Sequence, residues 1–142
     1  HTFEMRLRNI LMQIPTNVVS WYKDDIFSQK IGPLLIEKFS GELDDIKKHE
    51  LVLLLIEQRP RGWKVPLKKY IVASTKNSFY LCDVMMRLHR QYEYSYATPH
   101  ELKDIEYLIK MSAAKHFYGT KKPGMKAIKK ISDSVLPKRT ID

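Results

Sequence analysis

Cysteine is nearly absent from this chain of 142 residues: Cys82 is the only one, so a disulfide within the chain is excluded. Long apolar runs are absent too, because the longest, Leu51 to Ile56, is far shorter than the roughly 20 residues of a membrane-spanning helix. The N-terminus also lacks the basic and apolar regions of a signal peptide. We therefore expect an intracellular protein, nuclear or cytoplasmic, with no membrane among its partners.

Recognisable catalytic and metal-binding motifs are missing as well. The spacing of four histidines and the cysteine matches no zinc pattern: His49, His89, His100, His116 and Cys82. The carboxylate pairs Asp24-Asp25 and Asp44-Asp45 are neighbours in sequence, and neighbours on a helix do not face each other. No glycine-rich phosphate loop or nucleophile elbow is present. The sequence predicts a protein that is not an enzyme and that carries no metal or cofactor.

What the chain does have is a charge that is divided at Pro60. Residues 1–58 carry seven Lys and Arg against nine Asp and Glu, a net charge of −2. Residues 59–142 carry eighteen against seven, a net charge of +11. Charge that is segregated in this way usually faces a charged partner.

The apolar residues recur at helical spacing along almost the whole chain. We predict helices over 3–14, from Ser20 onward, over 43–58, from Pro66, from Asn77 or Ser78 to about Tyr92, from Thr98 to about Gly119, and over 125–135. The strongest local signal is Thr98-Pro99-His100-Glu101, where Thr98 caps the helix, Pro99 opens it and Glu101 completes a capping box. We predict an all-α, irregular or orthogonal bundle of six to seven helices.

We expect residues 1–142 to form a single helical domain. Because the chain begins at His1 and not at Met, we expect it to be a fragment of a larger protein. Residues 59–66 are predicted to be an exposed basic loop within that domain. The block Leu51 to Ile56 is apolar on all sides of a helix, which predicts a helix that other elements surround.

A first basic cluster begins in the predicted loop and has no acidic residue within it: Arg59, Arg61, Lys64, Lys68 and Lys69. Trp63 lies in the middle of the cluster. One interpretation is a phosphate-contacting loop in which Trp63 stacks on a base. The alternative is that Trp63 is buried and the charges are solvated, since tryptophan is usually mostly buried.

A second basic cluster lies near the C-terminus, where no acidic residue occurs between Glu106 and Asp133. It consists of Lys110, Lys115, Lys121, Lys122, Lys126, Lys129 and Lys130. We expect backbone N–H groups at the start of the last helix to point toward an incoming anion. The alternative is an ordinary solvated face. Lysine outnumbers arginine in this half of the chain by thirteen to five, which favours contact with phosphates over reading of bases.

Three tyrosines alternate with other residues in the same half of the chain: Tyr92, Tyr94 and Tyr96. In an extended segment all three would point to one side and offer a platform on which bases stack. We favour the simpler interpretation, in which Tyr92 ends a helical stripe and the other two pack under a loop.

These patterns lead to one functional interpretation and one alternative. The first is a non-enzymatic module that contacts RNA or DNA phosphates through its basic half. The residues expected to bind are Arg59, Arg61, Trp63, Lys64, Lys68, Lys69, Lys115, Lys121, Lys122, Lys126, Lys129 and Lys130. The alternative is a protein-docking or dimerisation module that binds an acidic or helical partner segment through this basic face or through Trp63, Tyr94 and Tyr96. Self-association is left open.

Overall fold

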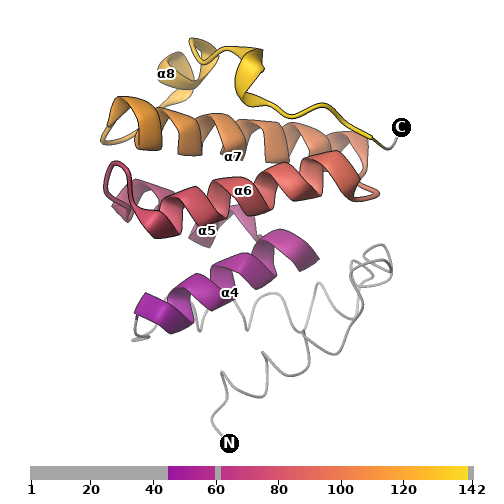
Figure 1. The fold of residues 1–142 in the computed structure, drawn as a ribbon, viewed down its shortest axis with the longest axis horizontal. Helices are drawn as coiled ribbons and strands as arrows, with labels where there is room; N and C mark the ends of the chain where they lie inside the picture. Colours follow the sequence, from indigo (N-terminus) through magenta and orange to yellow (C-terminus); the bar gives the residue numbers. More distant parts are fainter. Residues whose placement is uncertain (1–44, 60–61, 141–142) are drawn as a thin grey trace, which may run out of the picture. The chain divides into compact units, whose positions relative to one another are not determined.

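The computed structural model describes residues 45–59 and 62–140, and the chain divides into two compact units, His1–Leu67 and Lys68–Asp142. The helices of the described part are α4 (Asp45–Gln58), α5 (Lys64–Ala73), α6 (Phe79–Tyr94), α7 (Pro99–Tyr118), α8 (Met125–Lys129) and the 3-10 helix η3 (Asp133–Val135) (Figure 1). No strand occurs among these residues, which confirms the all-α class for the described part. Its five α-helices are fewer than the six to seven predicted for the chain, and the helices predicted over 3–14 and from Ser20 lie outside the described residues.

The described helix of the first unit is α4, and most of its apolar block is buried. Leu51, Val52, Leu55 and Ile56 are each at most 1% exposed. These four positions share one side of the helix, whereas Leu53 is half-buried and Ile46, in the first turn of α4, is 63% exposed. Burial is therefore confirmed for five of the six residues of the block, and the prediction that all sides are covered is wrong at Leu53.

The segment that follows α4 differs from the exposed loop that the sequence predicts. Arg59 and Trp63 are 2% and 5% exposed. Helix α5 begins at Lys64, two residues before Pro66, and continues across the boundary between the two units. Pro66 fits in this first turn because proline lacks an N–H, and the N–H groups of a first turn have no partner within the helix. A pattern of charges marks this segment as polar, but it does not reveal that two of its largest side chains are buried.

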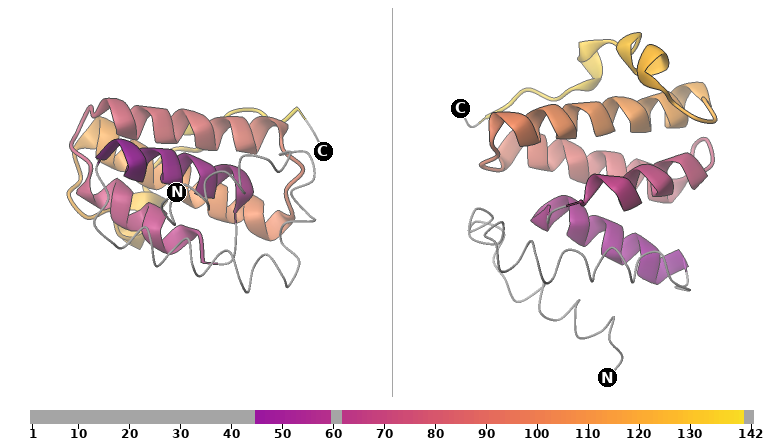
Figure 2. Two further views of the ribbon diagram at one scale, coloured as in Figure 1. Left: turned by 90° about the horizontal axis from the view of Figure 1, so that it is seen from below. Right: turned by 180° about the vertical axis from the view of Figure 1, so that it is seen from behind.

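The second unit is built around a hairpin of α6 and α7, which lie side by side (Figures 1 and 2). The facing stripes are fully buried, with Leu81, Val84 and Leu88 from α6 and Ile105 and Leu108 from α7 at 0% exposure. Because each buried aliphatic side chain stabilises the fold by about 1.5–3 kcal/mol, this stripe is the main source of stability in the hairpin.

Local signals set the ends of both helices. The Ser78 hydroxyl accepts from the Leu81 N–H at 3.4 Å and begins α6. The Thr98 hydroxyl accepts from the Glu101 N–H at 3.1 Å, and the Thr98 N–H donates to the Glu101 carboxylate at 3.4 Å. These hydrogen bonds confirm the predicted starts of both helices and the capping box.

The C-terminal segment covers the side of α7 that is turned away from α6 (Figures 1 and 2). The single helix predicted over 125–135 is wrong, because α8 ends at Lys129 and a separate turn, η3, begins at Asp133. Ser132 makes the break, since its hydroxyl accepts from the Ser134 N–H at 3.1 Å and starts the new turn. Serine competes with helical hydrogen bonding in this way.

The last described residues hold the C-terminal end of α6. The Arg139 guanidinium donates to the carbonyl of Tyr92 and to that of Ser95, the latter at 3.4 Å. The Glu93 carbonyl accepts from both the N–H and the hydroxyl of Thr140, at 3.1 and 2.8 Å. The last carbonyls of a helix have no partner within it, so these donors from the chain end supply what α6 lacks.

Candidate functional site

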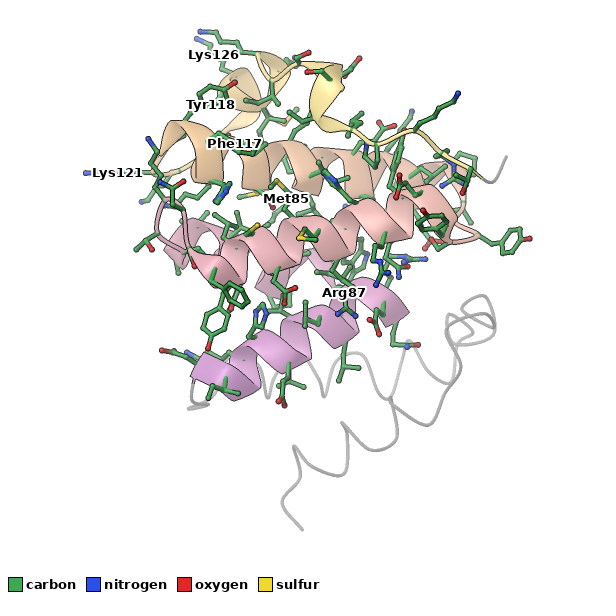
Figure 3. The ribbon with its side chains drawn as sticks, in the orientation of Figure 1. Met85, Arg87, Phe117, Tyr118, Lys121 and Lys126 are labelled. Atoms are coloured by element: carbon green, nitrogen blue, oxygen red, sulfur yellow. The ribbon has the colours of Figure 1, made fainter. Side chains whose placement is uncertain are left out.

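Five lysines that the sequence singles out are exposed together at one end of the second unit. Lys121 and Lys122 lie in the loop between α7 and α8, and Lys126, Lys129 and Lys130 lie in or just after α8. Figure 3 shows the labelled Lys121 and Lys126 extending from this end of the unit, near Tyr118. The structure thus brings the C-terminal part of the second basic cluster onto the surface.

A glycine with positive φ shapes this loop. Gly119 ends α7 in the left-handed conformation, with φ at 66°. Its N–H donates to the Lys115 carbonyl at 3.1 Å, and the Thr120 N–H donates to the Ala114 carbonyl at 3.2 Å. The bond from Gly119 to Lys115 is that of the αL motif, which commonly ends helices, and the left-handed glycine turns the chain toward Lys121.

The absence of a side chain at Gly119 leaves room for Lys76, a lysine that no pattern in the sequence singles out. A Cβ at Gly119 would lie only 3.1 Å from the side chain of Lys76, so Lys76 passes directly over the loop. Lys76 is itself exposed. We use the name lysine patch for six residues of the second unit: Lys76, Lys121, Lys122, Lys126, Lys129 and Lys130. Lys76 lies 45 residues before Lys121 in the chain, and no pattern in the sequence connects the two.

Lys115 is predicted from the sequence to bind nucleic acid, but its side chain is buried. It is only 7% exposed, and its ammonium donates to the carbonyls of Val72 at 2.9 Å and Lys121 at 3.1 Å. It therefore ties the loop before α8 to the end of α5 and is not available to a phosphate. The sequence contains a signal for this, because Lys115 follows the buried Leu108 by two helical turns and so continues its stripe.

The positive charge of the lysine patch has little to offset it. No ion pair involves any of the patch lysines in the part of the chain that the structure describes. The acidic residue that follows the patch in sequence, Asp133, accepts from the Lys110 ammonium. Lys110, the first member of the second cluster, thereby connects α7 to η3, and Asp133 forms its ion pair with a lysine that does not belong to the patch.

The first basic cluster is not gathered into one exposed surface of this kind. Arg59 is buried, which lowers the pKa of its guanidinium to about 10, and it donates to the Ile56 carbonyl at 3.1 Å. The Lys68 ammonium lies 4.9 Å from the centre of the Tyr107 ring. Lys69 is exposed and Lys64 is half-buried, while Arg61 lies outside the described residues. Buried Trp63 is not a stacking surface, so the lysine patch alone forms the candidate site.

Two aromatic side chains beside the patch are absent from the residues that the sequence predicts to bind. Phe117 and Tyr118 end α7 and are 53% and 69% exposed. The His116 ring meets the Phe117 ring edge to face, with 4.7 Å between the ring centres. Figure 3 shows Phe117 and Tyr118 at the same end of the unit as the labelled lysines. In the sequence, the sign that could have pointed to these two residues is their position as adjacent aromatics directly before Gly119, which ends the helix.

The three alternating tyrosines do not form a common platform. Helix α6 includes Tyr92 and Tyr94, so neighbouring tyrosines do not share one side of an extended strand. The Tyr92 hydroxyl donates to the Glu106 carboxylate at 3.0 Å and joins the two hairpin helices. Tyr94 and Tyr96 are 57% and 77% exposed, so they do not pack under a loop as the simpler interpretation expects.

The described residues offer little for other kinds of site. They contain no group of three histidines, cysteines or carboxylates that could hold a metal ion. Within the same residues, no helix has the length and apolar character needed to cross a bilayer. Cys82 is a half-buried free thiol in α6.

Comparison with known proteins gives no relative. No protein-family model, curated protein or solved structure matches this chain.

Proposed function

We propose that this protein is a non-enzymatic binding module that contacts the phosphates of nucleic acid through the lysine patch. The observation that carries the proposal is the exposure of five lysines within ten residues, joined by Lys76 from a distant part of the chain. Like charges this close repel one another, and the repulsion costs stability unless a partner neutralises them. An anionic polymer such as RNA or DNA supplies a matching row of charges.

Lysine chemistry indicates which part of the nucleic acid is bound. The lysine ammonium is a compact point charge, and it lacks the flat fork with which arginine reads guanine. The patch contains no arginine. The proposal is therefore binding to the backbone, with little dependence on sequence and a steep dependence on salt.

The experiment is a fluorescence-anisotropy titration of labelled single-stranded RNA and duplex DNA at about 50 and about 200 mM salt. Two variants each remove two exposed lysines: Lys126→Gln with Lys129→Gln in the patch, and Lys103→Gln with Lys138→Gln elsewhere on the second unit. We expect the first pair to weaken binding and to make the salt dependence less steep, by about 0.7 in log–log slope for each phosphate of a single strand that is no longer neutralised. Equal effects of the two pairs, or no binding to either probe, would reject the proposal.

A second candidate rests on the outer face of α6. Phe79, Met86 and Tyr94 are 79%, 60% and 57% exposed, and their spacing places them along one face of the helix. Large apolar side chains in a row are typical of a docking surface for a helical partner. Sedimentation velocity of the protein and of a Met86→Lys variant tests the simplest form of this candidate, self-association. A monomer at all concentrations would count against it.

A further inference from the structure

We infer that the preferred ligand of the lysine patch is an unpaired strand, whose bases stack on Phe117 and Tyr118 while its phosphates meet the lysines. This inference rests on the proposed function and adds to it the class of nucleic acid. Its basis is the position of two exposed aromatic rings in the last turn of α7, immediately before the loop that carries Lys121 and Lys122.

The rings of Phe117 and Tyr118 are exposed although their burial would stabilise the fold. An aromatic side chain that is more than half exposed leaves apolar area in water, where burial would stabilise the protein. Phe117 also has a neighbour that restricts it, because the His116 ring lies 4.7 Å away, centre to centre, with 71° between the two ring planes. A ring that is held in place and open to solvent offers a stacking face at a low cost in conformational entropy.

The arrangement of the rings and lysines fits a single strand better than a duplex. Phe117 and Tyr118 make no ring contact with each other among the described residues, so they offer two separate surfaces. Two separate faces beside a row of cations match the pattern of non-specific single-strand binding, in which bases stack on aromatics and a basic groove follows the backbone. The bases of a duplex are already stacked on each other, so a duplex can use the lysines but not the rings.

The test uses a double substitution, Phe117→Leu with Tyr118→Leu, in the full chain. Leucine keeps an apolar side chain and a good helix former while it removes the flat π face. The matched control is Phe79→Leu with Tyr94→Leu, which changes one exposed phenylalanine and one exposed tyrosine on α6. The probes are a labelled oligouridylate strand and a labelled DNA duplex.

We expect the Phe117/Tyr118 substitution to weaken binding to the single strand by about tenfold or more, since stacking contributes roughly 5- to 150-fold per base. Duplex affinity and the slope of the salt dependence stay unchanged, because the lysines remain. The control substitution leaves both affinities unchanged.

The possible failures can be told apart. If the lysine substitutions weaken binding but the Phe117/Tyr118 substitution leaves single-strand affinity unchanged, the stacking inference is wrong and the proposed function stands. If neither probe binds, both are wrong. If the chain binds phosphatidylserine vesicles and not oligouridylate, the lysine patch meets a lipid surface and the inference is overturned.

Discussion

The buried ammonium of Lys115 donates to the carbonyl of Lys121 at 3.1 Å, so one lysine fixes the backbone that presents the next. A second bond, to the Val72 carbonyl at 2.9 Å, connects the same ammonium to the last turn of α5. The two lysines are six residues apart and have opposite roles. Lys115 supports the loop from inside, and Lys121 faces solvent as part of the lysine patch.

Replacement of Lys115 by methionine should destabilise the protein. Methionine keeps a long flexible chain at this buried position, but the carbonyls of Val72 and Lys121 lose their donor. A buried polar group without its partner costs about 1–3 kcal/mol. Urea unfolding followed by circular dichroism measures the change, and Lys121→Met is the control because its side chain is exposed. Equal stabilities of the two variants would show that Lys115 has no structural role.

Replacement of Gly119 by alanine should also be destabilising. The φ of 66° at Gly119 costs an L-residue roughly 1–2 kcal/mol, and the new Cβ would press on the Lys76 side chain. Gly124→Ala is a matched control, because its φ is −98° and nothing lies within 4 Å of the position of its Cβ. We expect the control to change the free energy of unfolding by less than about 0.5 kcal/mol. An equal loss of stability at both positions would show that the left-handed conformation of Gly119 does not matter.

Removal of the Arg139 guanidinium should loosen the end of α6. In Arg139→Ala the carbonyls of Tyr92 and Ser95 lose a donor that also bears a charge favourable to a helix C-terminus, which stabilises by about 0.3–1 kcal/mol. Hydrogen exchange measured by mass spectrometry should speed up in the last turn of α6 and remain unchanged in the middle of α7. Lys138→Ala is the control, and unchanged exchange in Arg139→Ala would contradict the capping role.

The stability of the second unit should fall in mild acid because of His89. Burial lowers the pKa of this imidazole below its ordinary value of 6.5, against the opposing effects of Glu93 and of a backbone hydrogen bond at Val135. The unfolded chain therefore binds a proton more readily than the folded one as pH falls through 6.5 toward the lower folded value. Within that window the stabilising effect of the neutral form is lost.

Chemical denaturation at a series of pH values from about 7.5 to 5 measures this effect. Wild type should lose stability more steeply over the window than His89→Gln, which cannot titrate there. If wild type and the variant follow parallel curves, the lowered pKa of His89 does not contribute.

Features that depend on residues close together in the chain, such as the starts and ends of helices, could be predicted from the sequence. The start of α7 is determined by Thr98, Pro99 and Glu101, which lie within one turn of each other, so the pattern of residues specifies the geometry. The end of α7 is likewise determined by neighbouring residues, because Gly119 and the carbonyl of Lys115 that it bonds lie within one turn. The break at Ser132 escapes prediction because the apolar spacing over 125–135 is helical, and the competing hydroxyl bond to Ser134 decides the outcome.

Positions that depend on distant parts of the chain could not be predicted. Composition does not show that Arg59 and Trp63 are buried, since that follows from how the folded chain surrounds them. Lys76 belongs to the lysine patch only because its side chain lies against Gly119 in the folded chain. The basic character of the C-terminal half is visible in the sequence, whereas the separation of its lysines into exposed and structural ones requires the fold.

Nucleic acid should contact this protein at the lysine patch. Titration of isotope-labelled protein with an unlabelled oligouridylate, followed through amide chemical shifts in NMR spectra, locates that contact residue by residue. We expect the largest shifts to fall on Lys76 and on residues 117–131, with little change at the start of α7 around Lys103. Shifts that are absent, or that concentrate along Phe79, Met86 and Tyr94 on α6, would show that the lysine patch is not the binding surface.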